Sequence, residues 1–331
     1  MWDPDLIFDT SKNYFTEHVG ERVLAPTWGG YKDMKEIPLS LSYLQEAKRA
    51  GMKITPLLHN DFDLQETKKL LHDSGAVQNL ARQITATALV YDFDGWNLDF
   101  ENMDEADKFL YTKFIKTVSE KLHMHGKEIS VDLTVNSNSP NWSLCYDRKG
   151  MAAYVDYEVI MGYDQTPGGS RYSGPVSSYS WLKHHIAMLL KQVPNNKLVL
   201  GLPFYTRIWT GKEGQAASSV LMMKQIKSLL GQNNIGLFWN PEDRQYVGIW
   251  EENGQTRKVW FEERRSLQEK VSLAHDYKLA GLAFWRYGFE TEDIYDQIEG
   301  AYLNKKDESV RYKNRSEDIL IKFRERLKRA Q

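Results

Sequence analysis

The chain has 331 residues, of which 41% are hydrophobic and 27% charged, enough to bury one large core or two modest ones. Its formal net charge of -2 supplies no positive field that would attract nucleic acid or an anionic membrane, so we expect neither partner. Cys145 is the single cysteine, which excludes an intrachain disulfide and a cysteine-based metal cluster.

Short apolar or β-branched runs alternate with longer segments of helical period, the pattern of a parallel sheet with crossover helices. The predicted strands lie at residues 23–28, 54–59, 94–101, 129–135, 157–164, 198–205 and 282–287. An eighth strand, needed to close a (β/α)8 TIM barrel, is predicted at residues 2–8. We therefore expect the α/β class, with a catalytic TIM barrel over residues 1–304.

Two segments fall outside this alternation. Residues 206–263 are too long for a plain connection and contain a predicted hairpin at 246–250 and 258–261, so we expect a small insertion at the barrel mouth after strand seven. Residues 305–331 carry ten Lys or Arg against five Asp or Glu, with apolar residues at helical spacing. We expect a C-terminal basic helix packed on the barrel or trailing it; the alternative is a basic arm for an anionic polymer.

The most informative segment is residues 94–101, which read DGWNLDFE. On a strand, Asn97, Asp99 and Glu101 would share one face, while the large apolar residues between them cover the other. Burying carboxylates side by side raises the pKa of at least one of them, which keeps an acid protonated near neutral pH. An acidic segment beside a turn can also be a solvated edge, but the intervening apolar residues favour general-acid chemistry.

Polar or aromatic residues follow most of the predicted strands. In a TIM barrel the carboxyl ends of the strands form the catalytic face, so these residues are predicted to converge: Trp28, His59, Asn60, Glu101, Asn136, Tyr163, Asp164, Tyr205, Arg207, Trp285 and Arg286. The many Trp and Tyr residues are compatible with carbohydrate binding, because their flat faces stack on sugar rings. No metal-binding motif accompanies the paired histidines, so we expect no metal and no cofactor.

Four motifs resemble family 18 glycoside hydrolases, the chitinases and related N-acetylglucosaminidases. Residues 94–101 resemble the D-G-x-D-x-D-x-E signature of that family, and MGYD at 161–164 its M-x-Y-D strand. GLPFYTR at 201–207 is similar to the G-x-P-F-Y-x-R segment, and GLAFW at 281–285 to the last strand. Asn97 stands where chitinases usually have an aspartate. With this asparagine the motif most resembles that of the spore cortex-lytic and peptidoglycan N-acetylglucosaminidase subgroup. An asparagine cannot share a proton with Asp99 as a carboxylate can.

The resemblance implies retaining hydrolysis in which the 2-acetamido carbonyl of the substrate attacks the anomeric carbon. Glu101 would protonate the leaving oxygen and Asp99 would stabilise the oxazolinium intermediate. The implied roles of the other residues are orientation of Asp99 by Asn97, a hydrogen bond to the acetamido oxygen from Tyr163, an apolar floor from Trp285, and sugar contacts from Asp164, Arg207, Tyr205, Trp28 and Asn60. Without the resemblance, Trp285 could be a core indole, Tyr163 a buried phenol bonded to Asp132 or Asn97, and Arg207 and Asp164 a structural ion pair.

The implied activity is cleavage of β-1,4 bonds in a polysaccharide that contains N-acetylglucosamine, either peptidoglycan of the wall or spore cortex, or chitin. Two alternatives stay open: a non-catalytic lectin on the same barrel, which the presence of Glu101 disfavours, and a barrel hydrolase of another family that uses two carboxylates. We expect a monomer whose partner is the polysaccharide. We also expect an extracellular, wall-associated or spore-associated location, although Met1 to Pro4 do not begin a basic and apolar leader.

Overall fold

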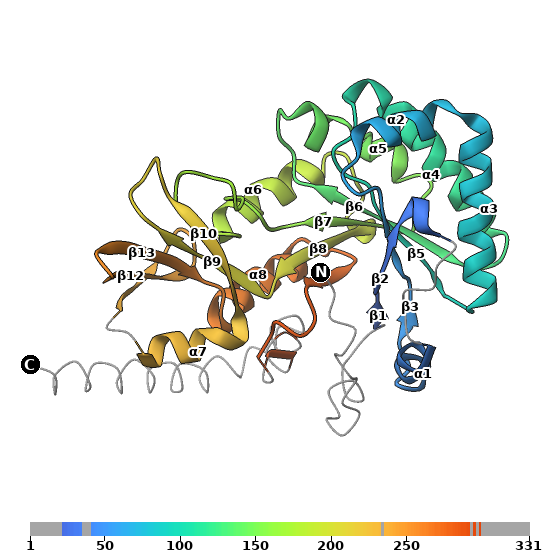
Figure 1. Ribbon diagram of the computed structural model, residues 1–331. Coiled ribbons are helices and arrows are strands. Elements are labelled where there is room, and N and C mark those ends of the chain that lie inside the picture. The colour runs from blue at the N-terminus through green and yellow to red at the C-terminus, as the bar shows by residue number, and fades with distance from the viewer. Residues whose placement is uncertain (1–21, 35–40, 233–234, 292–293, 296–297, 299–331) are drawn as a thin grey trace, which may run out of the picture.

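The computed structural model describes residues 22–34, 41–232, 235–291, 294–295 and 298. Its centre is a seven-stranded parallel sheet of order β14-β8-β7-β6-β5-β4-β2 (Figure 1). The strands are β2 (Thr27–Gly30), β4 (Leu57–His59), β5 (Gly95–Asp99), β6 (Glu128–Thr134), β7 (Tyr157–Met161), β8 (Leu198–Pro203) and β14 (Gly281–Trp285). Two short strands, β1 (Val23–Leu24) and β3 (Lys53–Ile54), pair in parallel just before β2 and β4. The seven strands predicted from residue 23 onward are therefore confirmed.

Neighbours in the sheet follow chain order, as they do in a singly wound barrel. Within the described residues, β2 and β14 are the two edges of this curled sheet, so the structure shows a half-barrel rather than a closed (β/α)8 barrel. The eighth strand predicted at 2–8 and the basic helix predicted at 305–331 lie outside the described residues. In the described part of the chain, no helix has the length and apolar character to span a bilayer.

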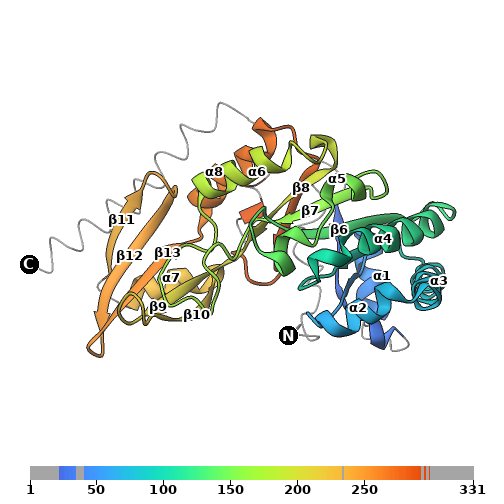
Figure 2. The same ribbon diagram turned by 90° about the horizontal axis from the view of Figure 1, so that it is seen from above.

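Helices connect successive strands, and α2 to α5 cover the same side of the sheet (Figures 1 and 2). The helices are α1 (Leu41–Arg49), α2 (Leu64–His72), α3 (Ser74–Val90), α4 (Lys108–His123), α5 (Arg148–Met151), α6 (Tyr179–Leu189), α7 (Met223–Gln232) and α8 (Arg264–Asp276). Helix α4 buries Phe114, Val118 and Leu122, one turn apart, as expected of an amphipathic helix. It ends just before Gly126, whose positive φ of 66° suits a residue without a side chain.

The core between helices and sheet fixes which way β5 faces. Trp96, Leu98 and Phe100 are fully buried. The indole N–H of Trp96 donates to the carbonyl of Ile84 in α3, and the ring of Phe100 stacks on Tyr111 of α4. Because side chains alternate along a strand, Asn97, Asp99 and Glu101 must face the opposite side, the interior of the half-barrel.

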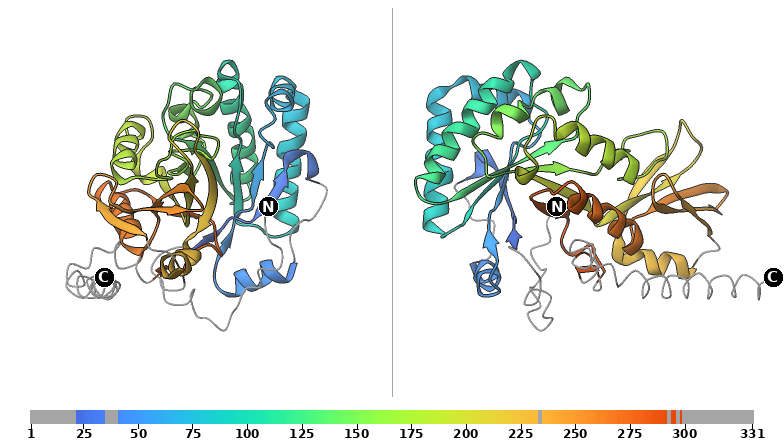
Figure 3. Two further views of the ribbon diagram at one scale, coloured as in Figure 1. Left: turned by 60° about the vertical axis from the view of Figure 1, so that its left-hand side comes forward. Right: turned by 180° about the vertical axis from the view of Figure 1, so that it is seen from behind.

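An antiparallel sheet of order β10-β9-β13-β12-β11 follows β8 and lies at the far end of the molecule from α2 to α4 (Figures 1 and 3). Its strands are β9 (Tyr205–Thr210), β10 (Ala217–Met222), β11 (Gly236–Asn240), β12 (Gln245–Glu252) and β13 (Gln255–Phe261). Strands β12 and β13 form the predicted hairpin. Its turn, Asn253-Gly254, has positive φ at both residues, the combination that suits a tight hairpin.

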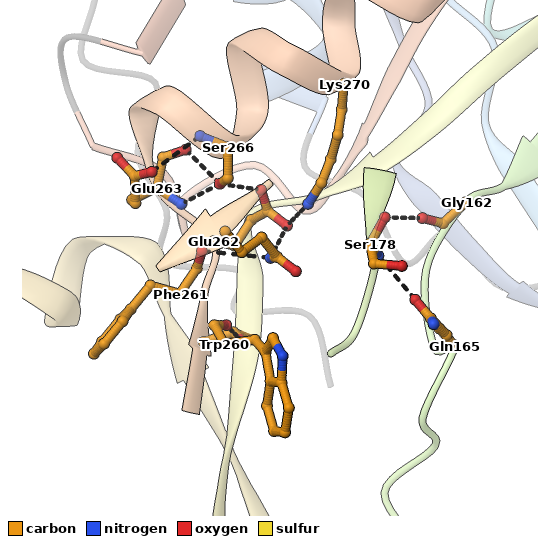
Figure 4. A network of polar contacts seen from close by, with 12 residues as sticks. Gly162, Gln165, Ser178, Trp260, Phe261, Glu262, Glu263, Ser266 and Lys270 are labelled. Carbon is orange, nitrogen blue, oxygen red and sulfur yellow. Dashed lines mark hydrogen bonds and ion pairs between the residues drawn. The ribbon is translucent and has the colours of Figure 1, made fainter. Parts of the chain in front are cut away.

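A buried polar network joins this sheet to α8 (Figure 4). Lys270 of α8 and Glu262, the residue after β13, form an ion pair whose side chains are 0% and 1% exposed. Ser266 donates to the other carboxylate oxygen of Glu262 at 2.7 Å. Glu263 caps α8 by accepting from the backbone N–H of Ser266. The network therefore fixes the point where the chain leaves the antiparallel sheet and returns to the parallel one.

Candidate active site

Asp99 and Glu101, at the carboxyl end of β5, are the centre of the site. Burial raises the pKa of Asp99 to about 6. Burial, together with the negative charges of Asp99, Asp132 and Asp164, raises the pKa of Glu101 to about 8. Glu101 is therefore mainly protonated at neutral pH and can act as a proton donor.

Asp132 of β6 is a further residue of the site, and the strand ends predicted to converge there did not include it. Asn97 donates from Nδ2 to Asp132 Oδ1 at 2.9 Å and to Ser130 Oγ at 3.0 Å. These contacts place the amide of Asn97 against β6, where it holds Asp132. Burial, and secondarily the charge of Asp99, raises the pKa of Asp132 well above its usual range. The signal in the sequence is the alternation of Ser130, Asp132 and Thr134 with apolar residues along the strand.

Tyr163, two residues beyond β7, lies among the carboxyl groups. Burial and the charges of Asp132 and Asp99 raise the pKa of this phenol well above its usual range, so it stays a hydrogen-bond donor. Its ring packs edge-on against Tyr205, with centroids 6.3 Å apart. Gly201, next to this ring, allows the close approach of β7, because a Cβ there would stand only 2.6 Å from the carbonyl oxygen of Ile160.

Tyr205, Asp164 and Arg207 form one polar group beside Tyr163. The hydroxyl of Tyr205 donates to Asp164 Oδ1 at 2.9 Å, and Arg207 Nη2 lies 3.7 Å from the same oxygen. The two charged residues thus pair with each other, as the alternative interpretation allowed. The Asp164 side chain is still 48% exposed, so the group remains open to a ligand.

Trp285 ends β14 and is 40% exposed, which does not fit the alternative of a core indole. The peptide bond that follows it, Trp285–Arg286, is cis. The backbone N–H of Phe204 donates to the Trp285 carbonyl at 2.7 Å, which ties the end of β14 to the end of β8. The indole is therefore fixed at the carboxyl edge of the sheet with a large apolar surface available for a sugar ring.

Two predicted sugar contacts are not placed where a sugar could reach them. Trp28 is 3% exposed and packs against Tyr91, Phe93 and Trp96 in the helix-facing core. The register of β2 against β4 shifts between Thr27 and Gly29, and Trp28 lies at that irregularity. Asn60 is 1% exposed and binds the backbone of Glu101 through both ends of its amide.

The part of the chain that the structure describes brings together no three His, Cys, Asp or Glu side chains that could hold a metal ion.

The sequence profile of the glycosyl hydrolases family 18 matches residues 40–290, so this chain belongs to that family. The uncharacterized glycosylase YvbX of Bacillus subtilis is 26% identical over 265 residues, which cover 77% of this chain and 76% of that protein. A cortical fragment-lytic enzyme of Bacillus subtilis is 26% identical over 246 residues, which cover 72% of this chain and 56% of that protein. This chain thus matches only a little over half the length of the cortical fragment-lytic enzyme.

Solved structures share the fold. The spore cortex-lytic enzyme SleL of Bacillus megaterium superposes with a TM-score of 0.76 at 21% identity, covering 88% of this chain and 69% of that one. A chitinase of Chromobacterium violaceum superposes with a TM-score of 0.78 at 20% identity, covering 85% and 91%. The family profile and the curated relatives together support a glycosidase.

Proposed function

We propose that this chain is a retaining glycoside hydrolase that cleaves β-1,4 bonds in peptidoglycan, with the acetamido group of an N-acetylglucosamine unit as the nucleophile. The observation that carries the proposal is the position of Glu101 at the carboxyl end of β5, close to the carboxyl groups of Asp99 and Asp132, where burial and their charges raise its pKa to about 8 and keep it protonated at neutral pH. Asp99, two residues earlier on the same face of β5, can stabilise a positive charge, which suits a reaction in which the substrate supplies its own nucleophile.

In this mechanism Glu101 donates its proton to the bridging oxygen and then, as a carboxylate, takes a proton from the incoming water. Asp99 accepts the acetamido N–H and stabilises the positive charge of the oxazolinium ring. Tyr163 donates to the acetamido oxygen and holds it near the anomeric carbon. Trp285 supports the sugar from below, and Asp164, Arg207 and Tyr205 bind its hydroxyl groups.

Peptidoglycan is the substrate that the relatives favour, because cortical fragment-lytic enzymes are among them and Asn97 matches the corresponding motif. Chitin is the alternative, since the fold is shared with chitinases. The proposed location follows from the substrate: the wall or the spore cortex, where the enzyme acts as a monomer on the polymer.

The test is to digest purified peptidoglycan and chitin oligomers side by side and to identify the products by mass spectrometry. The proposal predicts peptidoglycan fragments with N-acetylglucosamine at the reducing end. Cleavage of chitin alone would assign the other polymer. A chain that binds either polymer and cleaves neither would be a lectin, and a covalent glycosyl-enzyme on an acid would indicate the two-carboxylate mechanism.

A further inference from the structure

Asp99 and Asp132 stand side by side on neighbouring strands. In the parallel pairing of β5 with β6, Asn97 lies opposite Ser130 and Leu98 opposite Val131, so the next position on each strand sets Asp99 beside Asp132. Neighbouring strands are about 4.8 Å apart, and side chains at paired positions point to the same face. Both carboxyl groups therefore face the interior of the half-barrel.

The hydrogen bonds of the two carboxyl groups are unequal. Asp132 is 8% exposed and accepts from Asn97 at 2.9 Å. Asp99 Oδ1 is buried, and among the described residues no hydrogen-bond donor reaches it. A buried carboxylate oxygen without a donor is costly, whereas a proton shared with a neighbouring carboxyl would satisfy it.

No cation among the described groups neutralises this pair. The titratable groups that face it are Glu101, His59, which lies opposite Asp99 on β4, and Tyr163 beyond β7. Tyr111 of α4 acts on it electrostatically from the helix side. Two adjacent carboxylates in such a site cannot both ionise without strong repulsion, so they titrate as a unit.

We propose that Asp99 and Asp132 hold one proton between them, and that Asp132 is the positioning residue that supplies the second carboxyl of the site from β6. Asn97 keeps Asp132 in place. The inference rests on the proposed function, because it assigns to Asp99 the charge that stabilises the oxazolinium ring. When that positive charge develops, the shared proton resides on Asp132 and Asp99 is the anion that faces the acetamido N–H. After hydrolysis the proton is shared again, so no proton is gained or lost by the pair.

The test uses three variants of the whole chain: Asp132→Asn, Asn97→Asp, and both together. An amide at 132 can still accept from Asn97, so Asp132→Asn removes the carboxyl without removing the hydrogen bond between β5 and β6. The double variant exchanges the two side chains. It restores a carboxyl beside Asp99, on β5 instead of β6, and allows a hydrogen bond between positions 97 and 132 that is now donated from position 132.

We expect Asp132→Asn to lower kcat by about ten- to a hundredfold with little change in KM, because only the charge in the transition state is affected. The acid limb of its pH–rate profile should move to higher pH, since an amide N–H is a weaker donor to Asp99 than a carboxylic acid O–H. The double variant should recover both kcat and the acid limb. A double variant that folds and stays as slow as Asp132→Asn would overturn the role of the second carboxyl.

A second measurement does not need turnover. Infrared spectra at a pH above the acid limbs of both proteins should show one protonated carboxyl fewer in Asp132→Asn than in the native chain, and the double variant should regain it. Equal spectra for the native chain and Asp132→Asn would refute the shared proton. If the spectra differ as expected but the native chain cleaves no polysaccharide, the proposed function fails while the shared proton stands.

Discussion

The side-chain amide of Asn60 forms two hydrogen bonds with the backbone of Glu101. Asn60 Oδ1 accepts from the Glu101 N–H at 3.0 Å, and Asn60 Nδ2 donates to the Glu101 carbonyl at 2.7 Å. The backbone pairing of β4 with β5 ends at His59 and Asp99. Just beyond these two residues, the Asn60 side chain makes the hydrogen bonds to the Glu101 backbone that a paired strand would otherwise make. The Tyr146 hydroxyl holds the preceding carbonyl, that of Phe100, at 2.8 Å. The backbone of the acid is thus fixed by side chains.

We predict that Asn60→Ala lowers kcat by roughly a hundredfold, because a small displacement of Glu101 spoils its alignment with the bridging oxygen, while KM changes little. Asn60→Asp sharpens the test. Its carboxyl can accept the Glu101 N–H, but only its protonated form can donate to the Glu101 carbonyl, so its activity relative to native should rise as pH falls.

Ser119→Ala is the matched control for the Asn60 variants, since it also removes a partly buried hydrogen bond from a side chain to a backbone carbonyl, but in the helix layer. It should change stability without changing kcat. If Asn60→Ala folds and keeps native kcat, the clamp on Glu101 has no catalytic role.

The raised pKa of Glu101 also predicts a change in stability with pH. The pKa is about 8 in the folded chain and near 4.3 in an unfolded one, so the folded state binds this proton more tightly. The contribution of Glu101 to the free energy of unfolding must therefore fall as pH rises from about 4 through 8. The variant Glu101→Gln has no such carboxyl, so its stability should not show this fall. Above pH 8 the variant should be more stable than native by up to a few kcal/mol, measured by urea unfolding. A stability difference that stays constant from pH 4 to 9 would show that the carboxyl is not buried in this way.

Trp28 and Trp285 give a matched pair of tryptophan variants. Trp28→Ala removes a buried indole and should cost about 3–5 kcal/mol of stability, with unchanged KM for any chain that remains folded. Trp285→Ala removes an exposed ring and should leave stability nearly unchanged while raising KM about tenfold or more, through the lost stacking on sugar. Thermal unfolding and steady-state kinetics on the same samples separate the two effects. A raised KM with unchanged stability for Trp28→Ala, and lost stability with unchanged KM for Trp285→Ala, would show that Trp28 binds the sugar and Trp285 belongs to the core.

The buried pair of Lys270 and Glu262 predicts strong coupling between α8 and the antiparallel sheet. Lys270→Met leaves Glu262 buried without its partner and should destabilise the chain by about 3–5 kcal/mol. Adding Glu262→Met should recover much of that loss, because two apolar side chains can pack where one unpaired charge cannot. Urea unfolding of the three proteins measures the coupling, and additive losses would show that the two residues act independently.

Local alternation was enough to predict the seven described strands of the parallel sheet and the shared face of Asn97, Asp99 and Glu101. The residues after β7 and β8 meet as expected of strand ends in a parallel sheet, because Tyr205 contacts both Tyr163 and Asp164. What the sequence could not show depends on register and on turns.

Asp132 belongs to the site because β5 and β6 pair with Asn97 opposite Ser130, a relation between segments about 30 residues apart. Asn60 binds backbone rather than sugar because its amide turns onto the end of β5. Trp28 faces the helix layer because Thr27, its neighbour, pairs with Leu57, which in turn pairs with the inward-facing Asn97. None of the three follows from the periodicity of a single segment.

The most direct test of the account compares the native chain with Glu101→Gln in the hydrolysis of a soluble peptidoglycan fragment between pH 4 and 10. We expect a bell-shaped profile for the native chain, with an acid limb near pH 6 from Asp99 and its neighbour and a basic limb near pH 8 from Glu101. We also expect that Glu101→Gln still binds the fragment but turns it over at least about a hundredfold more slowly. Turnover by Glu101→Gln at the native rate, or a native rate that stays high above pH 9, would contradict the claim that this buried acid supplies the proton.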